Sequence, residues 1–118
     1  MKKVLVIEDN DQNLYLIRFI LKKNGYEVVE ARTGEDGVRM AAELNPDLIL
    51  MDIQLPYIDG LEATRRIRAS MGGNIPIIAV TSHAMTGDRE KSIEAGCTGY
   101  IEKPINPETI MLEIEKFV

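Results

Sequence analysis

Residues 48–52 read Leu-Ile-Leu-Met-Asp, which is four consecutive apolar residues followed directly by an acidic one. A short run that is apolar at every position is typical of a strand buried on both faces, as in the centre of a parallel sheet. Asp52 then falls at the carboxyl end of that strand, where ligands bind in open parallel sheets. The stretch therefore predicts an α/β fold with a polar site at the end of its central strand.

Four further short runs, rich in apolar and β-branched residues, alternate with longer amphipathic segments. Strands separated by helices run parallel, with right-handed crossovers and helices on both faces of the sheet. Five such units predict a doubly wound five-stranded parallel sheet of the flavodoxin-like type, in the order 2-1-3-4-5. The expected strands cover residues 4–7, 27–31, 48–51, 76–80 and 100–101. The expected helices cover residues 11–24, 33–45 and 88–95, with a third between Asp59 and the Gly72-Gly73 pair and a last one that begins at Asn106.

Local signals predict where several helices begin. Thr33, followed three residues later by Asp36, forms a capping box in which Asp36 stands in for the usual Glu. Asn106-Pro107 combines a good N-cap with a proline suited to the first helical turn. The fourth helix has in Ile93 nearly its only large apolar residue, so we expect this helix to be weakly anchored.

Length and charge limit the possible functions. The 118 residues suit one domain, and we expect residues 1–118 to form it without an output domain. The 14 basic and 19 acidic side chains give a formal charge of −5, which argues against a nucleic-acid-binding face. The N-terminus resembles neither a signal peptide nor a membrane span, so the expected location is the cytoplasm. The single cysteine, Cys97, excludes an internal disulfide and any CxxC motif, and we expect it to be buried near a turn.

Polar side chains follow the ends of four expected strands. Glu8 and Asp9 follow the first strand, Asp52 follows the third, Thr81 follows the fourth, and Lys103 lies just beyond the fifth. In the expected strand order these ends are neighbours, so the side chains would share one opening at the carboxyl edge of the sheet. The alternative, that acidic residues after strands are helix caps, applies to Asp9 and to Asp59 but explains Asp52 poorly.

Electrostatics narrows the chemistry of such an opening. Two carboxylates about 4 Å apart repel by on the order of 4 kcal/mol at an effective dielectric constant near 20, so three of them need a cation or a proton. Mg²⁺ prefers oxygen ligands and is often held by one or two carboxylates together with phosphate. Lys103 adds a positive charge and Thr81 a hydroxyl, both suited to phosphoryl oxygens. The residues therefore predict a magnesium-assisted phosphoryl site with Asp52 as the nucleophile.

Five short motifs follow one another along the chain: Ile7-Glu8-Asp9-Asn10, Leu50-Met51-Asp52-Ile53-Gln54-Leu55-Pro56, Asp59-Gly60, Ala79-Val80-Thr81 and Tyr100-Ile101-Glu102-Lys103-Pro104. In this order and at these spacings they resemble the receiver domain of two-component response regulators, the CheY-like superfamily. The resemblance covers the whole chain, and Glu8 stands where the family more often has Asp.

The resemblance implies a role for each matching residue. Asp52 would be the phosphoacceptor, and Lys103 would contact the phosphoryl group. Thr81 would follow that group when it arrives, and Tyr100 would then turn inward as the switch aromatic. The Lys103-Pro104 peptide bond would be cis. Four groups would hold Mg²⁺, or Mn²⁺ in its place: the side chains of Glu8, Asp9 and Asp52 and the backbone carbonyl of Gln54.

The implied function is signalling rather than catalysis on an external substrate. The chain would take a phosphoryl group from a histidine kinase or a histidine phosphotransfer protein and would assist its own phosphorylation and dephosphorylation. The surface of the fourth helix, fifth strand and fifth helix would then change, and with it the binding of a downstream signalling protein. No nucleic-acid or membrane partner is implied, and a monomer or weak homodimer is expected.

Residues 81–85, together with the expected lack of an output domain, most resemble stand-alone or phosphorelay receivers of the DivK type. His83 is expected to be an exposed loop residue. Its position, like that of Gln54, resembles one that influences the lifetime of the phosphoryl group in receivers.

Other protein classes share parts of this pattern. A calcium loop starting at Asp9 is excluded, because Leu14 stands where that loop needs Gly and Ile20 where it needs a bidentate Glu. A flavodoxin shares the fold, although residues 8–13 are acidic where an FMN phosphate would bind. An aspartate-nucleophile phosphatase would use Asp9 as its labelled residue. A pseudo-receiver would bind partners without phosphoryl chemistry.

Overall fold

The computed structural model describes residues 1–71, 74–82 and 88–118. Within these residues the chain forms a parallel sheet in the order β2-β1-β3-β4-β5, which confirms the predicted fold and strand order. The Gly72-Gly73 pair and His83, for which the sequence made predictions, lie outside the described residues. The strands are β1 (Lys3–Ile7), β2 (Glu27–Ala31), β3 (Leu48–Asp52), β4 (Ile77–Thr81) and β5 (Gly99–Glu102). The helices are α1 (Asp11–Lys23), α2 (Gly34–Leu44), α3 (Gly60–Met71), α4 (Asp88–Ala95) and α5 (Ile110–Glu115).

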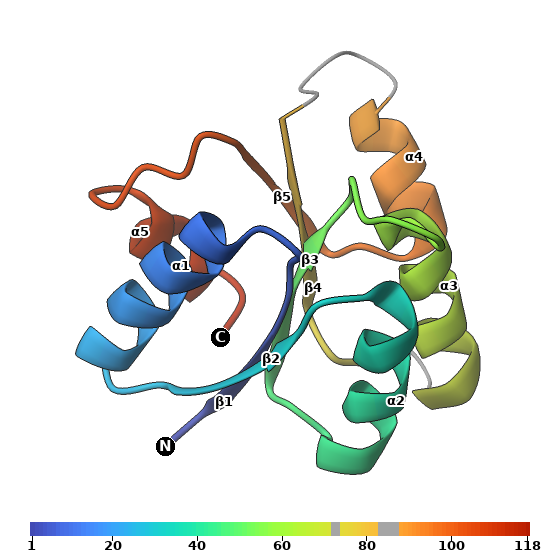
Figure 1. The fold of residues 1–118 in the computed structure, drawn as a ribbon, viewed down its shortest axis with the longest axis horizontal. Helices are drawn as coiled ribbons and strands as arrows, with labels where there is room; N and C mark the ends of the chain where they lie inside the picture. The colour runs from blue at the N-terminus through green and yellow to red at the C-terminus, as the bar shows by residue number, and fades with distance from the viewer. Residues whose placement is uncertain (72–73, 83–87) are drawn as a thin grey trace.

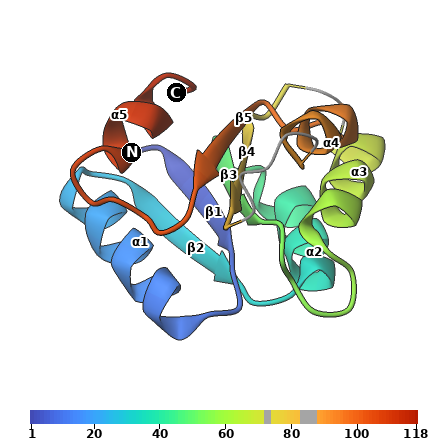
Figure 2. The same cartoon turned by 90° about the horizontal axis from the view of Figure 1, so that it is seen from above.

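The sheet lies between two layers of helices (Figures 1 and 2). Helices α1 and α5 cover one face, and α2, α3 and α4 cover the other. Successive strand residues point to opposite faces, so Val4 and Val6 pack with α1 and α5, while Leu5 and Ile7 pack with α2 and α3. Every residue of β3 is buried, which explains why its sequence is apolar until Asp52 ends it.

The hydrogen bonds at the starts of α1 and α3 show which residues cap these two helices. The cap of α1 is Asn10, whose Oδ1 accepts a hydrogen bond of 2.9 Å from the Asn13 backbone N–H. Asp59 precedes α3 and accepts one of 2.9 Å from the Glu62 backbone N–H. The capping alternative therefore holds for Asp59, whereas the α1 cap is the residue after Asp9 and leaves the Asp9 carboxylate for another role.

The predicted start of α2 is confirmed, and that of α5 is wrong by a few residues. Thr33 accepts a hydrogen bond of 3.1 Å from the Asp36 backbone N–H, as the capping box requires. Helix α5 begins only at Ile110. The Asn106 side chain accepts a hydrogen bond of 2.9 Å from the Glu108 backbone N–H, so it closes a turn that precedes the helix.

Helix α4 makes little use of its one large apolar residue. The side chain of Ile93 is 55% exposed, whereas the small side chains of Ser92 and Ala95 are buried. Neither of the two hydrophobic clusters includes a described residue of α4. Few apolar contacts of its described residues therefore hold this helix against the rest of the fold, and more than half of the Ile93 side chain faces solvent. Cys97, just beyond α4, is buried as predicted.

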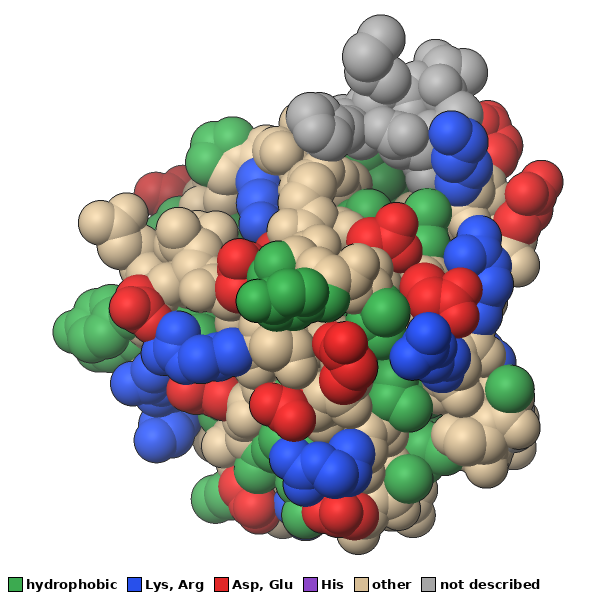
Figure 3. Space-filling view, turned by 45° about the vertical axis from the view of Figure 1, so that its right-hand side comes forward, with side chains coloured by type: hydrophobic (Ala, Val, Ile, Leu, Met, Phe, Trp, Pro, Cys, Tyr) green, Lys and Arg blue, Asp and Glu red, His purple; other side chains and the backbone are tan. Residues whose placement is uncertain are grey.

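Acidic and basic side chains are interspersed over the face of the molecule shown in Figure 3. Along α2, Arg39 pairs with Asp36 and Glu43, both at 3.4 Å, and along α3 Arg66 pairs with Glu62 at 3.0 Å. Exposed pairs of this kind contribute about 0–1 kcal/mol each, so they mark solvated helix faces. Of the helices in the described part of the chain, none has the length and apolarity needed to span a bilayer.

Candidate functional site

The register of the sheet brings the ends of its central strands together. Ile7, the last residue of β1, pairs with Met51, and Asp52, the last residue of β3, pairs with Val80. Glu8, directly after β1, therefore lies beside Asp52 at the carboxyl edge. Both side chains are nearly inaccessible to solvent, with 2% of Glu8 and 3% of Asp52 exposed.

Three carboxyl groups form an acidic cluster at this edge. One carboxylate oxygen from each of Glu8, Asp9 and Asp52 lies within 4.8 Å of the other two. Glu8 and Asp52 are buried while Asp9 is exposed, so the cluster opens to solvent on one side. Oxygen ligands at this spacing, with an open side for water, fit a hard divalent cation such as Mg²⁺. The donor set could therefore hold the ion that the sequence predicts.

Lys103 supplies the positive charge in the cluster. Its Nζ lies 3.1 Å from Asp52 Oδ1 and 3.2 Å from Glu8 Oε1. The backbone N–H of Lys103 donates to the carbonyl of Thr81 at 2.7 Å, which extends the pairing of β4 and β5 up to the site. Burial alone would lower the pKa of the Lys103 ammonium, but the attraction of the two carboxylates outweighs it and raises the pKa. Lys103 therefore stays charged. The Lys103-Pro104 bond is cis, as the resemblance implies.

Glu8 is the carboxyl group whose pKa is raised by its burial next to Asp52. Burial and the neighbouring Asp52 carboxylate together raise its pKa from 4.5 to about 7, against the opposing effect of Lys103. The backbone N–H of Asn10 donates to Glu8 Oε2 at 3.2 Å and also favours the ionised form. Without a metal ion, Glu8 is thus about half protonated at neutral pH, so a proton neutralises part of the cluster.

We expect the free energy of unfolding in metal-free buffer to fall as pH rises from about 5 to about 8. The unfolded chain ionises Glu8 near its ordinary pKa of 4.5, whereas the folded chain keeps the proton up to about 7. Over that window the folded state binds more protons, so raising the pH removes stability, by on the order of 3 kcal/mol in total. Urea unfolding at several pH values measures this loss, and Glu8→Gln is expected to flatten the profile. An equally steep profile in Glu8→Gln would contradict the assignment.

The side chain of Gln54 joins the site in a way that the sequence did not predict. Its Nε2 donates to Thr81 Oγ1 at 2.8 Å, and its backbone N–H donates to Asp52 Oδ1 at 3.1 Å. Thr81 is 1% exposed, so this hydrogen bond lies in the interior. The sequence placed Gln54 just beyond a central strand and at a position that resembles one influencing phosphoryl lifetime, but it gave no sign of a hydrogen bond to Thr81.

The structure thus brings together five of the seven predicted site residues, and a sixth, Gln54, contacts two of them, Asp52 and Thr81. The seventh, Tyr100, is half-buried in β5 and pairs with Ala79 in the sheet. It packs against the hydrophobic cluster on the α2–α4 face and borders a surface pocket that Ile93 and Phe117 also line. Tyr100 therefore belongs to the surface between α4 and α5. The five are Glu8, Asp9, Asp52, Thr81 and Lys103.

A doubly wound parallel sheet with three carboxylates and a lysine at its carboxyl edge defines a class of domain suited to a cation and a phosphoryl group. Comparison with known families makes the class specific. Residues 4–115 match the response regulator receiver domain, and the chain belongs to this family. Receivers are signalling phosphoacceptors of two-component systems that interact with histidine kinases or phosphotransfer proteins. Membership rules out the flavodoxin and phosphatase alternatives.

Two curated relatives differ in how much of them the chain covers. It is 42% identical over 118 residues to the polar-differentiation response regulator DivK of Brucella ovis, covering 99% of this chain and 96% of DivK. It is 46% identical over 129 residues to hybrid signal transduction histidine kinase I of Dictyostelium discoideum, covering 99% of this chain but 7% of that kinase. The chain therefore spans a small fraction of the hybrid kinase and nearly all of DivK.

Solved structures give the same family. The receiver domain of a sensor histidine kinase of Pseudomonas aeruginosa, which has a magnesium ion coordinated in its active site cleft, matches with a TM-score of 0.90 and 38% identity, covering 98% of this chain and 96% of that one. Chemotaxis protein CheY4 of Vibrio cholerae matches with a TM-score of 0.94 and 28% identity, covering 100% and 99%.

Proposed function

We propose that this chain accepts a phosphoryl group on Asp52, with Mg²⁺, from a histidine kinase or a histidine phosphotransfer protein. The observation that carries the proposal is the set of groups that surround Asp52 Oδ1. That oxygen belongs to the acidic cluster and has the Lys103 ammonium at 3.1 Å and the Gln54 backbone N–H at 3.1 Å. A carboxylate in these surroundings stays oriented and close to positive charge, as a nucleophile for phosphorus requires.

The chain's own residues would position and neutralise the reacting groups. An oxygen of Asp52 would attack phosphorus as the bond from phosphorus to the donor imidazole nitrogen breaks, and the imidazole would leave with that electron pair. Lys103 would neutralise charge on the phosphoryl oxygens. Glu8, Asp9, Asp52 and the Gln54 carbonyl would hold Mg²⁺, which supplies further positive charge to those oxygens when bound. The same groups would assist attack by water when the phosphoryl group is lost.

Incubation of the purified chain with Mg²⁺ and acetyl phosphate tests this function. Intact mass spectrometry is expected to show one added phosphoryl group, stable in acid and removed by hydroxylamine, as an acyl phosphate should be. Chelation of Mg²⁺ with EDTA is expected to prevent the addition. A wild-type chain that never gains the adduct, with metal and donor both present, would overturn the proposal in favour of a pseudo-receiver.

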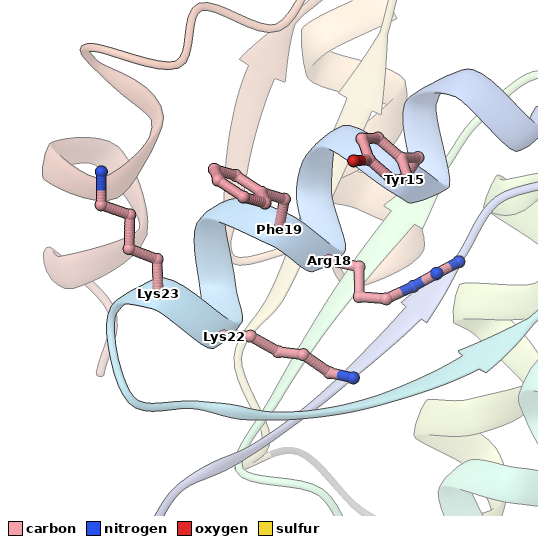
Figure 4. A pocket seen from close by; sticks show the side chains of 5 residues that line it. All are labelled: Tyr15, Arg18, Phe19, Lys22 and Lys23. Atoms are coloured by element: carbon pink, nitrogen blue, oxygen red, sulfur yellow. The ribbon is translucent and has the colours of Figure 1, made fainter.

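The exposed face of α1 is the surface that we propose for the phosphodonor protein. Tyr15 and Phe19 point outward from this helix beside Arg18, Lys22 and Lys23, and the two aromatic side chains are 65% and 57% exposed (Figure 4). Helix α1 begins two residues after Asp9, so the first turns of this face lie nearest the site and its later residues extend away from it. Because the whole chain carries a charge of −5, a local basic and aromatic surface favours a partner with apolar and acidic side chains. Such a donor would meet the chain in the cytoplasm, the location predicted from the sequence.

Phe19→Ala is expected to lower the rate of phosphotransfer from a cognate histidine kinase about tenfold, because truncating an aromatic residue that anchors an interface costs about 1.4 kcal/mol or more. Labelling by acetyl phosphate, which needs no docking surface, is expected to stay unchanged. Leu112→Ala is the matched control, since Leu112 is similarly exposed, at 66%, but lies on α5. Equal loss in both variants, or loss with acetyl phosphate, would contradict this surface.

A further inference from the structure

The side-chain amide of Gln54 bridges the ends of two central strands. On one side its Nε2 donates to Thr81 Oγ1 at 2.8 Å. On the other its Oε1 accepts from the Ser82 backbone N–H at 3.4 Å and from the Ser82 hydroxyl at 3.3 Å. One amide from the residues after β3 therefore contacts both the last residue of β4 and the residue that follows it.

Hydrogen-bond chemistry fixes the direction of this bridge. The backbone N–H of Ser82 can only donate, so the end of the amide that faces it must be the oxygen. The –NH₂ end then faces Thr81, whose hydroxyl oxygen accepts. Gln54 is also tied at its own backbone, where the N–H donates to Asp52 Oδ1. The amide thus cannot follow a displaced Thr81 side chain without giving up its contacts with Ser82.

We propose that Gln54 is a latch that holds the Thr81 hydroxyl in the unphosphorylated form and must release it when Thr81 moves to a phosphoryl group on Asp52. The inference rests on the proposed function, and it assigns Gln54 an effect on the equilibrium between two positions of Thr81 rather than on phosphoryl lifetime alone. Breaking the 2.8 Å hydrogen bond opposes the switch. Removing the amide should therefore favour the phosphorylated arrangement.

Gln54→Met tests the latch, because methionine has a similar length and lacks the amide. Beryllofluoride with Mg²⁺, a noncovalent analogue of the phosphoryl group, is the probe, and calorimetric titration measures its affinity. We expect Gln54→Met to bind about two- to tenfold more tightly than the wild type, the factor that corresponds to one neutral hydrogen bond. In a Thr81→Val background, which has no hydroxyl to hold, the same substitution is expected to change nothing.

A second readout does not depend on ligand. In the unmodified protein, hydrogen exchange of the Ser82 amide is expected to be several-fold faster in Gln54→Met, because its acceptor is gone. Gln12→Met, at the exposed glutamine of α1, is the matched control and should alter neither measurement. If the wild type fails to bind beryllofluoride, the proposed function is overturned, and the latch, which depends on it, is overturned as well. If the wild type binds but Gln54→Met binds equally, or if its gain persists in Thr81→Val, only the latch is overturned.

Discussion

Asp52→Asn is expected to abolish the acetyl phosphate adduct completely. The amide has nearly the same shape as the carboxylate, so β3 should end as before, but its oxygen is neutral and a poor nucleophile for phosphorus. The substitution also removes one of the two carboxylates that lie within 3.2 Å of Lys103 Nζ. Mass spectrometry of the variant after incubation with Mg²⁺ and acetyl phosphate measures the loss, and circular dichroism checks that the fold remains.

Asp9→Asn is the matched control for this experiment. Asp9 belongs to the same acidic cluster but is exposed, and we assign it to the metal rather than to the phosphoryl group. Asp9→Asn is therefore expected to raise the Mg²⁺ concentration needed for labelling while Asp52 still carries the adduct. If Asp52→Asn gained the adduct and Asp9→Asn did not, the phosphoryl group would lie on Asp9 and the assignment would be contradicted.

Gly60→Ala is expected to lower the free energy of unfolding by about 3 kcal/mol or more, although Ala favours helices over Gly. Gly60 is the first residue of α3 and packs against the end of β3. A Cβ there would lie 2.2 Å from the Asp52 carbonyl oxygen and 2.7 Å from the Ile53 Cα, both of them backbone atoms. The helix or the strand must therefore shift, and a shift of the strand moves the phosphoacceptor. Urea unfolding measures the loss, and the acetyl phosphate assay measures its consequence.

Gly34→Ala provides the comparison for Gly60→Ala. Gly34 is the first residue of α2, so the two substitutions change helix propensity at the same helical position. A Cβ at Gly34 would meet the side chain of Ile58, with Cγ1 at 2.6 Å, and that half-buried side chain can turn away. We expect a loss of about 1 kcal/mol or less. Similar losses in the two variants would show that contact with the β3 backbone is not the cause.

Most of the fold was predictable because its signals are local. The apolar run that ends at Asp52 indicated a central strand, and the capping box at Thr33 indicated the start of α2. The site residues were predictable for a related reason, since the parallel topology requires that groups at the ends of β1, β3, β4 and β5 meet at one edge. The roles that we assign to those residues come from the family and stay predictions until the labelling experiments are done.

The sequence predicted less where local signals compete with packing. It indicated a weakly anchored α4 but not that Ile93 would be 55% exposed while the small residues Ser92 and Ala95 are buried. Asn106 carries a strong helix-start signal, but its side chain satisfies a nearer N–H, and the helix starts after that turn. In both cases the sequence identified the residue but did not predict its surroundings in the fold.

Polar contacts between residues far apart in the chain could not be predicted from the sequence. Arg68 of α3 donates from Nε to the Gly96 carbonyl at 2.9 Å and from Nη2 to Thr98 Oγ1 at 3.3 Å, so it joins α3 to the turn between α4 and β5. The bridge from Gln54 to Thr81 spans 27 residues in the same way. A hydrogen bond of this kind depends on the positions of two side chains to within a few tenths of an ångström, and no periodicity or spacing encodes that.

The amino-acid sequence alone determined the order of the strands, the edge at which the polar groups gather and the family to which the chain belongs. The strand order and the shared edge follow from hydrophobic pattern and topology, which act through many residues at once, and the family follows from five motifs spread along the chain. The tertiary structure alone decided that Glu8 takes a pKa of about 7, that Asn10 rather than Asp9 caps α1, and that Gln54 holds Thr81. Each of these depends on burial and on distances between particular atoms, which exist only once the chain has folded.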